Sequence, residues 1–480
     1  MNVLFASSEV FPLIKTGGLA DVSQSLVVAL QALGTSVSLI LPGYRSVREK
    51  LPAPTASYRF DDAFIPQDLV LLEQVLPDTN IRLLLVDCPS LFDRAGGPYV
   101  DEQGTDWSDN PQRFGIFCRA VVALLAGRCQ LQDAFDVVHC NDWQTGLVPA
   151  LLQLESLPVR SVMTIHNLAY QGVYGYDAFE ALALPEQWWA YDKLEFYGNF
   201  SFLKAGIVYA DQVTTVSPTY AREILQEPMA CGMSGLLQYH AGKLHGILNG
   251  ADYQIWNPAT DPLLRFHYDV DSLEEKLHNK LDLQRSLGLQ LGKSIPLIGL
   301  VSRLVHQKGV DWVAQVIARM ADDKVQWVIL GTGDKLLEKS LLTLAREFPK
   351  KIAVTIGYDE TLAHRIEAGS DLFMMPSRYE PCGLNQIYSL RYGTLPIVRA
   401  TGGLADTVVD TNAESIKSGT ATGFSYQGET ATDLEQCVRR AIGYFSKRKT
   451  WDGLQRNAMT QQFDWHASAQ QYLHLYQPAE

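Results

Sequence analysis

The sequence is poor in the features that mark secreted, membrane-spanning and metal-binding proteins. Its seven cysteines are scattered among 480 residues, odd in number and free of Cys-x-x-Cys spacing, which favours reduced thiols over a disulfide framework or a zinc site. No apolar run approaches the roughly 18 residues that span a bilayer. The first residues, MNVLFASSEVFP, lack the basic segment and small-residue cleavage site of a secretory signal. We therefore expect a cytoplasmic protein without membrane contact.

Positive charge is also in short supply. The chain has 40 Lys and Arg against 53 Asp and Glu, a net charge of −13, whereas nucleic-acid binders normally present a basic face. We therefore expect no nucleic-acid partner, and an anionic small ligand only where a few Lys and Arg converge locally. The hydrophobic content of 47% is ordinary for a globular protein. The length suggests two or three domains.

A β–α pattern repeats along the chain. Residues 2–8 form a short apolar run that is followed by a glycine turn and then by Val22, Leu26, Leu30 and Leu33 at helical spacing. Similar runs recur at 36–42, 81–87, 135–142, 160–167 and 211–218, and again at 296–302, 325–331, 351–357, 370–376 and 394–400. Runs without polar alternation are typical of parallel strands that are buried on both faces.

The pattern is interrupted by a polar stretch at about 269–294 and then restarts. This predicts two doubly wound α/β domains, which we place at residues 1–248 and 249–480. The last helical stretch, at about 465–477, could pack on either domain. The Asp-Val-Asp triplet at 269–271 superficially resembles a cation site, but it lies in the polar stretch, and we interpret it as solvated surface. No metal site is predicted.

The hexapeptide Thr-Gly-Gly-Leu-Ala-Asp occurs twice, at 16–21 and at 401–406. Each copy opens a helical segment, where unpaired backbone N–H groups attract anions and glycine allows a close approach. A lone glycine pair is more often a tight turn, and neither copy matches a nucleotide-binding pattern, but the duplication favours ligand binding. Lys15 precedes the first copy and Ala400 the second. The first loop should therefore add a full charge, and the second should offer backbone donors alone.

Charged side chains follow two strands of the second half. Arg303 and Lys308 come after the run at 296–302, and they either form a solvated surface pair or hold a diphosphate and stabilise a departing negative charge. Glu380 follows the run at 370–376 at the mouth of a helix, where it is either a helix cap or a partner for a sugar hydroxyl.

Polar side chains also end two strands of the first half. His166 and Asn167 follow one run, and Asp142 follows its neighbour. A lone histidine after a strand is more often structural. Two polar clusters on the edge that carries Lys15 instead favour a polyhydroxyl ligand, because sugars need convergent donors and acceptors.

These motifs together resemble one family. In order along the chain they are KTGGLADV, HNLAYQG, ILNGAD, VSRLVHQKG, PSRYEPCGLNQ and YGTLPIVRATGGLADTV. They are similar to those of bacterial glycogen synthases and plant starch synthases over essentially the whole chain. The resemblance implies a GT-B fold, in which two Rossmann-like domains face each other across a deep cleft. It also implies transfer of glucose from ADP-glucose to the non-reducing end of an α-1,4-glucan such as glycogen or a malto-oligosaccharide, with retention of configuration, release of ADP and no metal or other cofactor.

The resemblance also implies roles for individual residues. The implied catalytic residues are His166, Arg303, Lys308 and Glu380. The implied donor-binding residues are Lys15, Gly17, Gly18, Asp142, Asn167, Asn249, Tyr358, Cys382, Gly383, Leu384, Thr401, Gly402 and Gly403. Arg303 and Lys308 match the family's diphosphate pair, and Tyr358 matches the position that stacks on adenine. Cys382 has no evident base that would make it a nucleophile, so the sequence itself favours a packed side chain there.

One position departs from a neighbouring class of retaining enzymes, which carry a second Glu eight residues after the first. Tyr388 occupies that position here, so we expect front-face displacement and not a mechanism with two carboxylates on this helix. Other functions fit less well. A dinucleotide-dependent oxidoreductase needs Gly-x-Gly-x-x-Gly spacing, and a glucan phosphorylase needs a cofactor lysine that no motif supplies. A catalytically silent sugar-binding or regulatory protein would be expected to lose the charged set.

Overall fold

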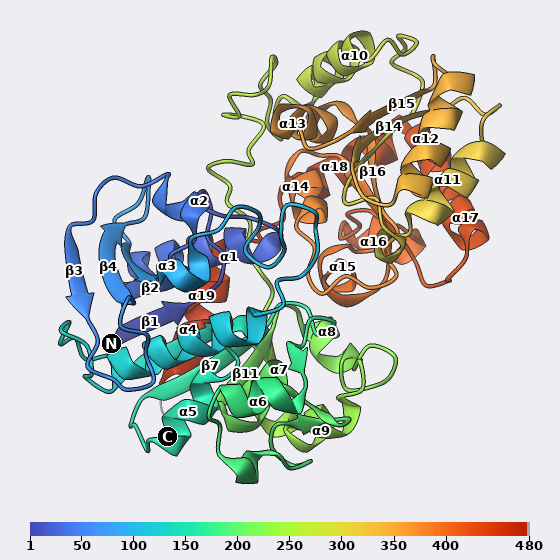
Figure 1. The fold of residues 1–480 in the computed structure, drawn as a ribbon. Coiled ribbons are helices and arrows are strands. Elements are labelled where there is room, and N and C mark those ends of the chain that lie inside the picture. The colour runs from blue at the N-terminus through green and yellow to red at the C-terminus, as the bar shows by residue number, and fades with distance from the viewer. Residues whose placement is uncertain (478–480) are drawn as a thin grey trace. The chain divides into compact units, whose positions relative to one another are not determined.

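The computed structural model describes residues 1–477 and divides into two compact units. Unit 1 comprises residues 1–250 and the helix that begins at Trp465, and unit 2 comprises Ala251–Asp464 (Figure 1). The sequence had not decided which domain holds the last helix, and in the structure this helix belongs to unit 1.

Unit 1 is built on a sheet with the strand order β12-β11-β7-β6-β1-β2-β5-β4-β3. Adjacent strands run parallel except at β3–β4 and β4–β5. Strands β2 to β5 all lie on one side of β1, and β6 lies on the other side, so the strand order reverses between β1 and β6. The bounds are β1 (Asn2–Ala6), β2 (Ser36–Pro42), β3 (Ala56–Arg59), β4 (Val70–Val75), β5 (Arg82–Asp87), β6 (Val137–Asn141), β7 (Arg160–Ile165), β11 (Gln212–Thr215) and β12 (Leu244–Gly246).

The helices of unit 1 form two groups. One contains α1 (Gly18–Ala32) and α19 (Trp465–Tyr476), which pack on each other, and the other contains α4 (Asn110–Leu125), α5 (Val148–Leu154) and α7 (Phe202–Tyr209). Shorter elements are α2 (Arg45–Arg48), α3 (Pro89–Phe92), α6 (Tyr176–Ala181), α8 (Pro218–Glu223), α9 (Ser234–Tyr239) and a small antiparallel sheet of β8 (Val173–Tyr174), β10 (Asn199–Ser201) and β9 (Glu195–Phe196).

Helix α19 is fixed to the core of unit 1, among elements from the other end of the chain (Figure 1). The Tyr476 hydroxyl lies 2.6 Å from Nδ1 of the fully buried His139 on β6. Arg160 of β7 donates to the carbonyl of Leu475 at 2.9 Å. These contacts join the end of the chain to the middle of the sheet.

Unit 2 is built on an all-parallel sheet with the order β15-β14-β13-β16-β17-β18, which reverses between β13 and β16. Its strands are β13 (Leu297–Val301), β14 (Gln326–Gly331), β15 (Ile352–Ile356), β16 (Leu372–Met375), β17 (Leu395–Arg399) and β18 (Phe424–Tyr426). Its helices are α10 (Lys276–Ser286), α11 (Val310–Arg319), α12 (Lys335–Glu347), α13 (Glu360–Gly369), α14 (Asn385–Arg391), α15 (Gly402–Thr407), α16 (Ala413–Ser418), α17 (Ala431–Phe445) and α18 (Arg448–Met459).

Alternate strand residues of unit 2 enter two different cores. Ile298 and Leu300 pack in the cluster that includes α11 and α17, whereas Leu297 packs in the cluster that includes Leu283 of α10 and Ile366 of α13. Successive side chains of a strand point to opposite faces of its sheet. Both faces are therefore apolar, which explains the strand runs without polar alternation.

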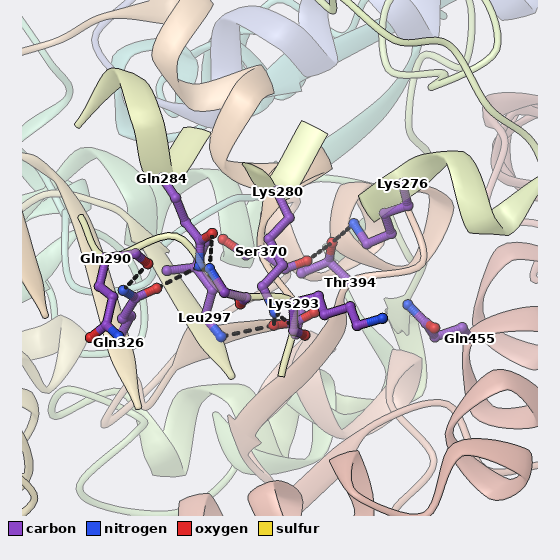
Figure 2. A network of polar contacts seen from close by, with 12 residues as sticks. Lys276, Lys280, Gln284, Gln290, Lys293, Leu297, Gln326, Ser370, Thr394 and Gln455 are labelled. Atoms are coloured by element: carbon purple, nitrogen blue, oxygen red, sulfur yellow. Dashed lines mark hydrogen bonds and ion pairs between the residues drawn. The ribbon is translucent and has the colours of Figure 1, made fainter. Parts of the chain in front are cut away.

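A buried polar network holds α10 against the amino ends of the strands (Figure 2). Lys280 forms an ion pair with Asp371 at 2.6 Å, and the same carboxylate accepts from the Leu297 N–H at 2.8 Å. Lys276 donates to the Thr394 hydroxyl at 2.6 Å, and burial lowers the pKa of this lysine to about 7. The network lies at the end of the sheet opposite to the carboxyl ends and so serves the fold.

Within residues 1–477, no helix has the length and apolar character needed to cross a membrane. None of the seven cysteines, all of which lie in this range, forms a disulfide, and six of them are buried. In the same range, no group of three or more His, Cys, Asp or Glu side chains is arranged to hold a metal ion.

Candidate active site

The charged and polar residues singled out in the sequence follow the strands at which each sheet reverses its order. In unit 1, Lys15 follows β1, and Asp142 directly follows β6. In unit 2, Lys308 lies between β13 and α11, and Glu380 follows β16. In open parallel sheets, ligands bind outside the carboxyl ends of the strands at this reversal point. Each unit therefore carries a half-site where its topology favours one.

The half-site of unit 2 is centred on an ion pair. Lys308 Nζ lies 2.5 Å from Glu380 Oε2, and the Ser377 hydroxyl donates to the same oxygen at 2.9 Å. Both charged side chains are largely buried, with exposed fractions of 19% and 8%. The sequence had suggested separate partners for these two residues. The structure brings them together, so the charge of Lys308 is held in place by a carboxylate.

The loop after β13 is held against the end of β16 by a close backbone contact. Gly309 has φ +68°, and a Cβ there would lie 2.2 Å from the carbonyl oxygen of Pro376, so only glycine fits. Arg303 stands apart from this contact. Its side chain is exposed, and its Nη2 is 3.5 Å from Gln307 Oε1, which is at the outer limit for a hydrogen bond. Arg303 is thus much less constrained than Lys308.

The second glycine loop serves the fold more than the sequence suggested. The N–H of Gly403 donates to the carbonyls of Glu380 at 3.2 Å and Pro381 at 3.1 Å, and the N–H of Thr401 donates to Arg399 at 2.9 Å. The N–H groups of Thr401 and Gly403 are thus engaged by backbone carbonyls, and the role of this loop toward a ligand stays a prediction. The loop supports the segment that carries Glu380.

The segment after Glu380 is also largely structural. Cys382 is 5% exposed, in line with a packed side chain. Gly383 has φ +72°, and a Cβ there would lie 2.5 Å from Gln386 Oε1, whereas Leu384 is the N-cap residue of α14. The ring of Tyr388 is buried and stacks on Trp256 at a centroid distance of 4.0 Å and an interplanar angle of 3°. The position of the second glutamate in related enzymes is thus filled by a packed aromatic ring.

Tyr358 lies farther from the reversal point than the other predicted residues of unit 2. It follows β15, which is separated from β13 by β14. The side chain is 77% exposed, and its hydroxyl donates to Glu360. An accessible aromatic face is what stacking on a base requires. Its role toward adenine stays a prediction.

The first glycine loop is held by Glu9, which sequence reasoning missed. The carboxylate of this buried residue accepts from the N–H of Thr16 at 2.5 Å and from the N–H of Gly17 at 3.3 Å. It also accepts from the hydroxyls of Thr16 at 2.5 Å and Tyr99 at 2.6 Å. The N–H of Gly17 is thus engaged by Glu9, and its role toward a ligand stays a prediction. Gly18, the first residue of α1, has an N–H with no acceptor among residues 1–477.

Lys15 is also engaged by a protein group. Its Nζ lies 2.8 Å from Asp21 Oδ1, in a pair whose lysine side chain is 40% exposed. The full charge that the sequence predicted on this loop is thus held in an exposed ion pair. Exposed pairs contribute little to stability, so a phosphate could replace Asp21 as the partner of this ammonium group at small cost.

Asp142 adopts a strained backbone conformation. Its φ of 55° and ψ of −177° lie in a region that is occupied almost only by glycine and costs a residue with a side chain about 1–3 kcal/mol. Its Oδ1 accepts from the His166 N–H at 2.8 Å. Burial raises the pKa of the carboxyl to about 7, although hydrogen bonds from the backbone of His166 and Asn167 oppose the shift. Strain combined with a perturbed pKa is typical of a functional residue.

His166 is half-buried, and burial lowers the pKa of its imidazole to about 3, so the ring is neutral at physiological pH. Its Nε2 lies 2.9 Å from Oδ1 of Asn141, a residue that the sequence reading had not singled out. The neighbouring Asn167 closes a turn by accepting from the N–H of Ala169 at 3.1 Å. Asn249, near the end of unit 1, has a buried Oδ1 that accepts no hydrogen bond from residues 1–477.

The positions of Glu9 and Asn141 near the ends of predicted strands could have marked them as candidate site residues. Glu9 comes three residues after β1 and Asn141 is the last residue of β6, so both occupy the edge that carries Lys15 and Asp142. Neither belongs to a charged cluster, and their roles depend on hydrogen bonds to residues that are distant in the sequence or on another strand. Only the folded chain displays those partners.

The fold and the family models define a class: a glycosyltransferase with two Rossmann-like domains, the GT-B fold. Residues 2–239 match the family model described as the starch synthase catalytic domain, and residues 288–451 match glycosyl transferases group 1. The structure is similar to the sucrose-phosphate synthase of Thermosynechococcus elongatus, with a TM-score of 0.60 at 19% identity over 99% of this chain and 98% of that one. This likeness concerns the fold alone.

Two further comparisons define the family. The chain is 48% identical to a glycogen synthase from Nitrosomonas eutropha, over 99% of this chain and 96% of that protein. It is 33% identical to the catalytic domain of starch synthase IV from Arabidopsis thaliana bound to ADP and acarbose, with a TM-score of 0.87 over 99% of this chain and 98% of that one. The chain belongs to the glycogen synthase and starch synthase family. These findings favour an enzyme over a catalytically silent sugar-binding protein.

Proposed function

We propose that this glycosyltransferase is a glycogen synthase that transfers glucose from ADP-glucose to the non-reducing end of an α-1,4-glucan, with retention of configuration. The observation that carries the proposal is the placement of Lys308, Glu380, Asp142 and His166 after strands at or next to the reversal points of the two sheets. The match to glycogen synthases along almost the whole chain supports the same reaction.

In this proposal, unit 2 binds the donor. Arg303 and Lys308 stabilise the negative charge that develops on the departing diphosphate, as preorganised cations do in transfer reactions. Glu380 keeps Lys308 oriented and contacts the hydroxyl groups of glucose. Tyr358 stacks on the adenine. Because Arg303 is exposed and only weakly held, it is the member of the set most able to move toward a bound phosphate.

Unit 1 contributes polar groups for the transferred glucose and the acceptor. Lys15 and the Gly18 N–H add positive potential for the phosphates. Asp142, His166, Asn167 and Asn249 supply acceptors and donors for sugar hydroxyls. The buried, unpartnered Oδ1 of Asn249 is satisfied when a ligand hydroxyl donates to it.

The proposed reaction is a front-face displacement. The bond between C1 of glucose and the phosphate oxygen breaks, the bond between C1 and the acceptor O4 forms on the same face, and the acceptor proton passes to the departing phosphate. One observation supports it: Tyr388 takes the place of a second carboxylate on α14. Isolation of a covalent glucosyl–protein adduct would rule this mechanism out.

The donor preference is tested by comparing ADP-glucose and UDP-glucose under identical conditions, with glycogen as the acceptor and with and without EDTA. We expect kcat/KM to be much higher for ADP-glucose and unchanged by EDTA. Comparable rates with both donors would remove ADP specificity from the proposal, and loss of activity in EDTA would contradict a metal-free reaction. A cytoplasmic location is also part of the proposal, and the absence of disulfides among the seven cysteines supports a reducing compartment.

A further inference from the structure

The neighbour of His166 on β6 determines which of its ring nitrogens carries the proton. Asn141, the last residue of β6, is fully buried. Its amide nitrogen donates to the carbonyl oxygen of Ala6 on β1 at 3.0 Å, and its Oδ1 lies 2.9 Å from His166 Nε2. A backbone carbonyl only accepts hydrogen bonds, so the amide cannot turn over without placing two acceptors against each other. The orientation of Asn141 is therefore fixed by β1.

This orientation leaves His166 one way to complete the contact. Oδ1 of Asn141 is an acceptor, so Nε2 of His166 must be the donor, and in a neutral imidazole the other nitrogen is then unprotonated. No residue among 1–477 donates to Nδ1 of His166. The backbone N–H of His166 is bonded to Asp142 at 2.8 Å, which holds the ring at the carboxyl edge of the sheet.

We propose that Asn141 is a positioning residue that keeps His166 as the neutral Nε2–H tautomer, so that Nδ1 accepts a hydrogen bond from a hydroxyl of the transferred glucose. The proposal rests on the proposed function for the identity of the ligand, but the tautomer follows from the protein contacts alone. The unprotonated Nδ1 makes this part of unit 1 selective for a ligand group that donates a hydrogen bond, such as a hydroxyl. A negatively charged group at the same place would face a lone pair and be repelled.

The other titratable groups near the ring are consistent with a neutral imidazole. His139, two residues before Asn141, is fully buried between the Tyr476 and Thr164 hydroxyls at 2.6 Å each, and burial lowers its pKa to about 3. Asp142 is directed by its Oδ1 to the backbone of His166, not to its ring. No carboxylate among residues 1–477 forms an ion pair with the imidazole of His166.

The first test is a nitrogen-15 NMR spectrum of the full chain labelled at its ten histidines. The His166→Gln variant identifies the His166 signals by their loss. We expect the pattern of the Nε2–H tautomer from pH 6 to pH 9 without titration. A protonated Nδ1 in the neutral ring, or a titration near pH 6.5, would overturn the proposal whatever the activity.

The second test changes the acceptor. In Asn141→Asp, a carboxylate replaces the amide and favours the imidazolium, so Nδ1 becomes a donor. We expect the pKa of His166 to rise into the range from 6 to 8. We also expect kcat/KM to fall about 10-fold or more at pH 6, with partial recovery toward pH 9. Asn141→Leu, of similar size, should lose activity at every pH without that recovery.

The matched control is Asn167→Asp, which places the same charge at the end of the next strand, where the side chain bonds to the turn at Ala169. We expect it to leave the tautomer of His166 unchanged, whatever it does to turnover. If Asn141→Leu does not fold, the wild-type spectrum and Asn141→Asp still decide the outcome. If the wild-type protein transfers no glucose, the proposed function fails, and the spectra still decide the tautomer. An Asn141→Asp enzyme with a wild-type pH profile would contradict the proposal.

Discussion

The two copies of Thr-Gly-Gly-Leu-Ala-Asp are identical in sequence but are used differently. In the second copy, Gly402 has φ +45°, and Cβ atoms at Gly402 and Gly403 would lie 1.9 Å and 2.1 Å from the carbonyl oxygens of Glu380 and Cys382. In the first copy, no heavy atom of residues 1–477 lies within 4 Å of a Cβ placed at Gly17 or Gly18, and neither glycine has a positive φ. The glycines of the second loop are required by the fold, whereas those of the first are not.

The glycines of the two loops leave room beside the backbone for different reasons. Unit 2 needs its glycines so that one loop can support the segment carrying Glu380. Unit 1 holds its loop with a side chain, Glu9, and leaves the surface at Gly17 and Gly18 open. An open glycine that the fold does not need is best explained by the close approach of a ligand. The two loops should therefore respond differently to substitution.

The largest expected effect comes from Gly403→Ala. A methyl group 2.1 Å from a backbone carbonyl forces the loop away from Glu380, and we expect unit 2 to lose more than about 4 kcal/mol of stability. The partner variant, Gly18→Ala, should change the free energy of unfolding by less than about 1 kcal/mol and lower kcat/KM about 10-fold or more. Thermal and urea unfolding with parallel rate measurements compare the two. Equal stability losses would erase the distinction between the loops.

The lysines next to the loops give the next largest effect. We expect Lys308→Ala to lower kcat by about 10²–10³-fold, because it removes the cation nearest the departing phosphate. It should also cost some stability, since Glu380 is left buried and unpaired. Lys15→Ala, which breaks an exposed pair, should act mainly on the KM for the donor, by about 10-fold.

A double variant separates the catalytic role of Lys308 from its structural one. Glu380→Gln in the Lys308→Ala background removes the unpaired charge and should restore stability, whereas kcat should stay well below that of Glu380→Gln alone. Recovery of turnover together with stability would show that Lys308 acts only through the fold, and normal turnover in Lys308→Ala alone would remove it from the mechanism.

Glu9→Gln should affect the first loop alone. The amide oxygen still accepts two of the four hydrogen bonds, but the charge that collects four donors is lost, at a cost of about 1–2 kcal/mol. We expect kcat/KM to fall about 10-fold as the loop loosens. Hydrogen exchange should increase at residues 15–18 and stay unchanged at residues 401–403, where backbone carbonyls hold the loop. Faster exchange in both segments would argue against a local role.

The last expected effect is a change of stability with pH at Asp142. Its folded pKa of about 7 lies above the ordinary value of 3.8, so the folded state binds the proton more tightly than the unfolded state. The stability it contributes is complete below pH 3.8 and is lost as the pH rises through 7. Relative to Asp142→Asn, the wild-type protein should lose about 1–3 kcal/mol between pH 4 and pH 8. If the free energies of unfolding of the two proteins change with pH in the same way across this range, the assignment is contradicted.

The sequence predicted the α/β class and most strands because runs such as residues 296–302 lack polar alternation. It also predicted that Lys15, Asp142, Lys308 and Glu380 follow strands. It could not predict the order of the strands, on which the two reversal points depend. Nor could it assign the last helix, because the decisive contact joins Tyr476 to His139, 337 residues earlier in the chain.

The repeated hexapeptide shows the limit of reading a motif by itself. Six identical residues suggested two ligand loops, yet the N–H groups of Thr401 and Gly403 bind backbone carbonyls and that of Gly17 binds Glu9. Those partners are distant in sequence or belong to another loop, and no local pattern announces them. The strain at Asp142 is equally invisible in the sequence, since its φ and ψ are set by the turn between β6 and η1 (Trp143–Thr145).

The most direct test of the central claim follows the label of ADP-[14C]glucose into glycogen, in the presence of EDTA, by the wild-type chain and by Lys308→Ala with confirmed folding. We expect the wild-type protein to label the polymer at its chain ends, so that β-amylase releases the label. We expect the rate of the variant to be at least about 100-fold lower. An intact wild-type protein that leaves the polymer unlabelled, or a variant that labels it at the wild-type rate, would contradict the account.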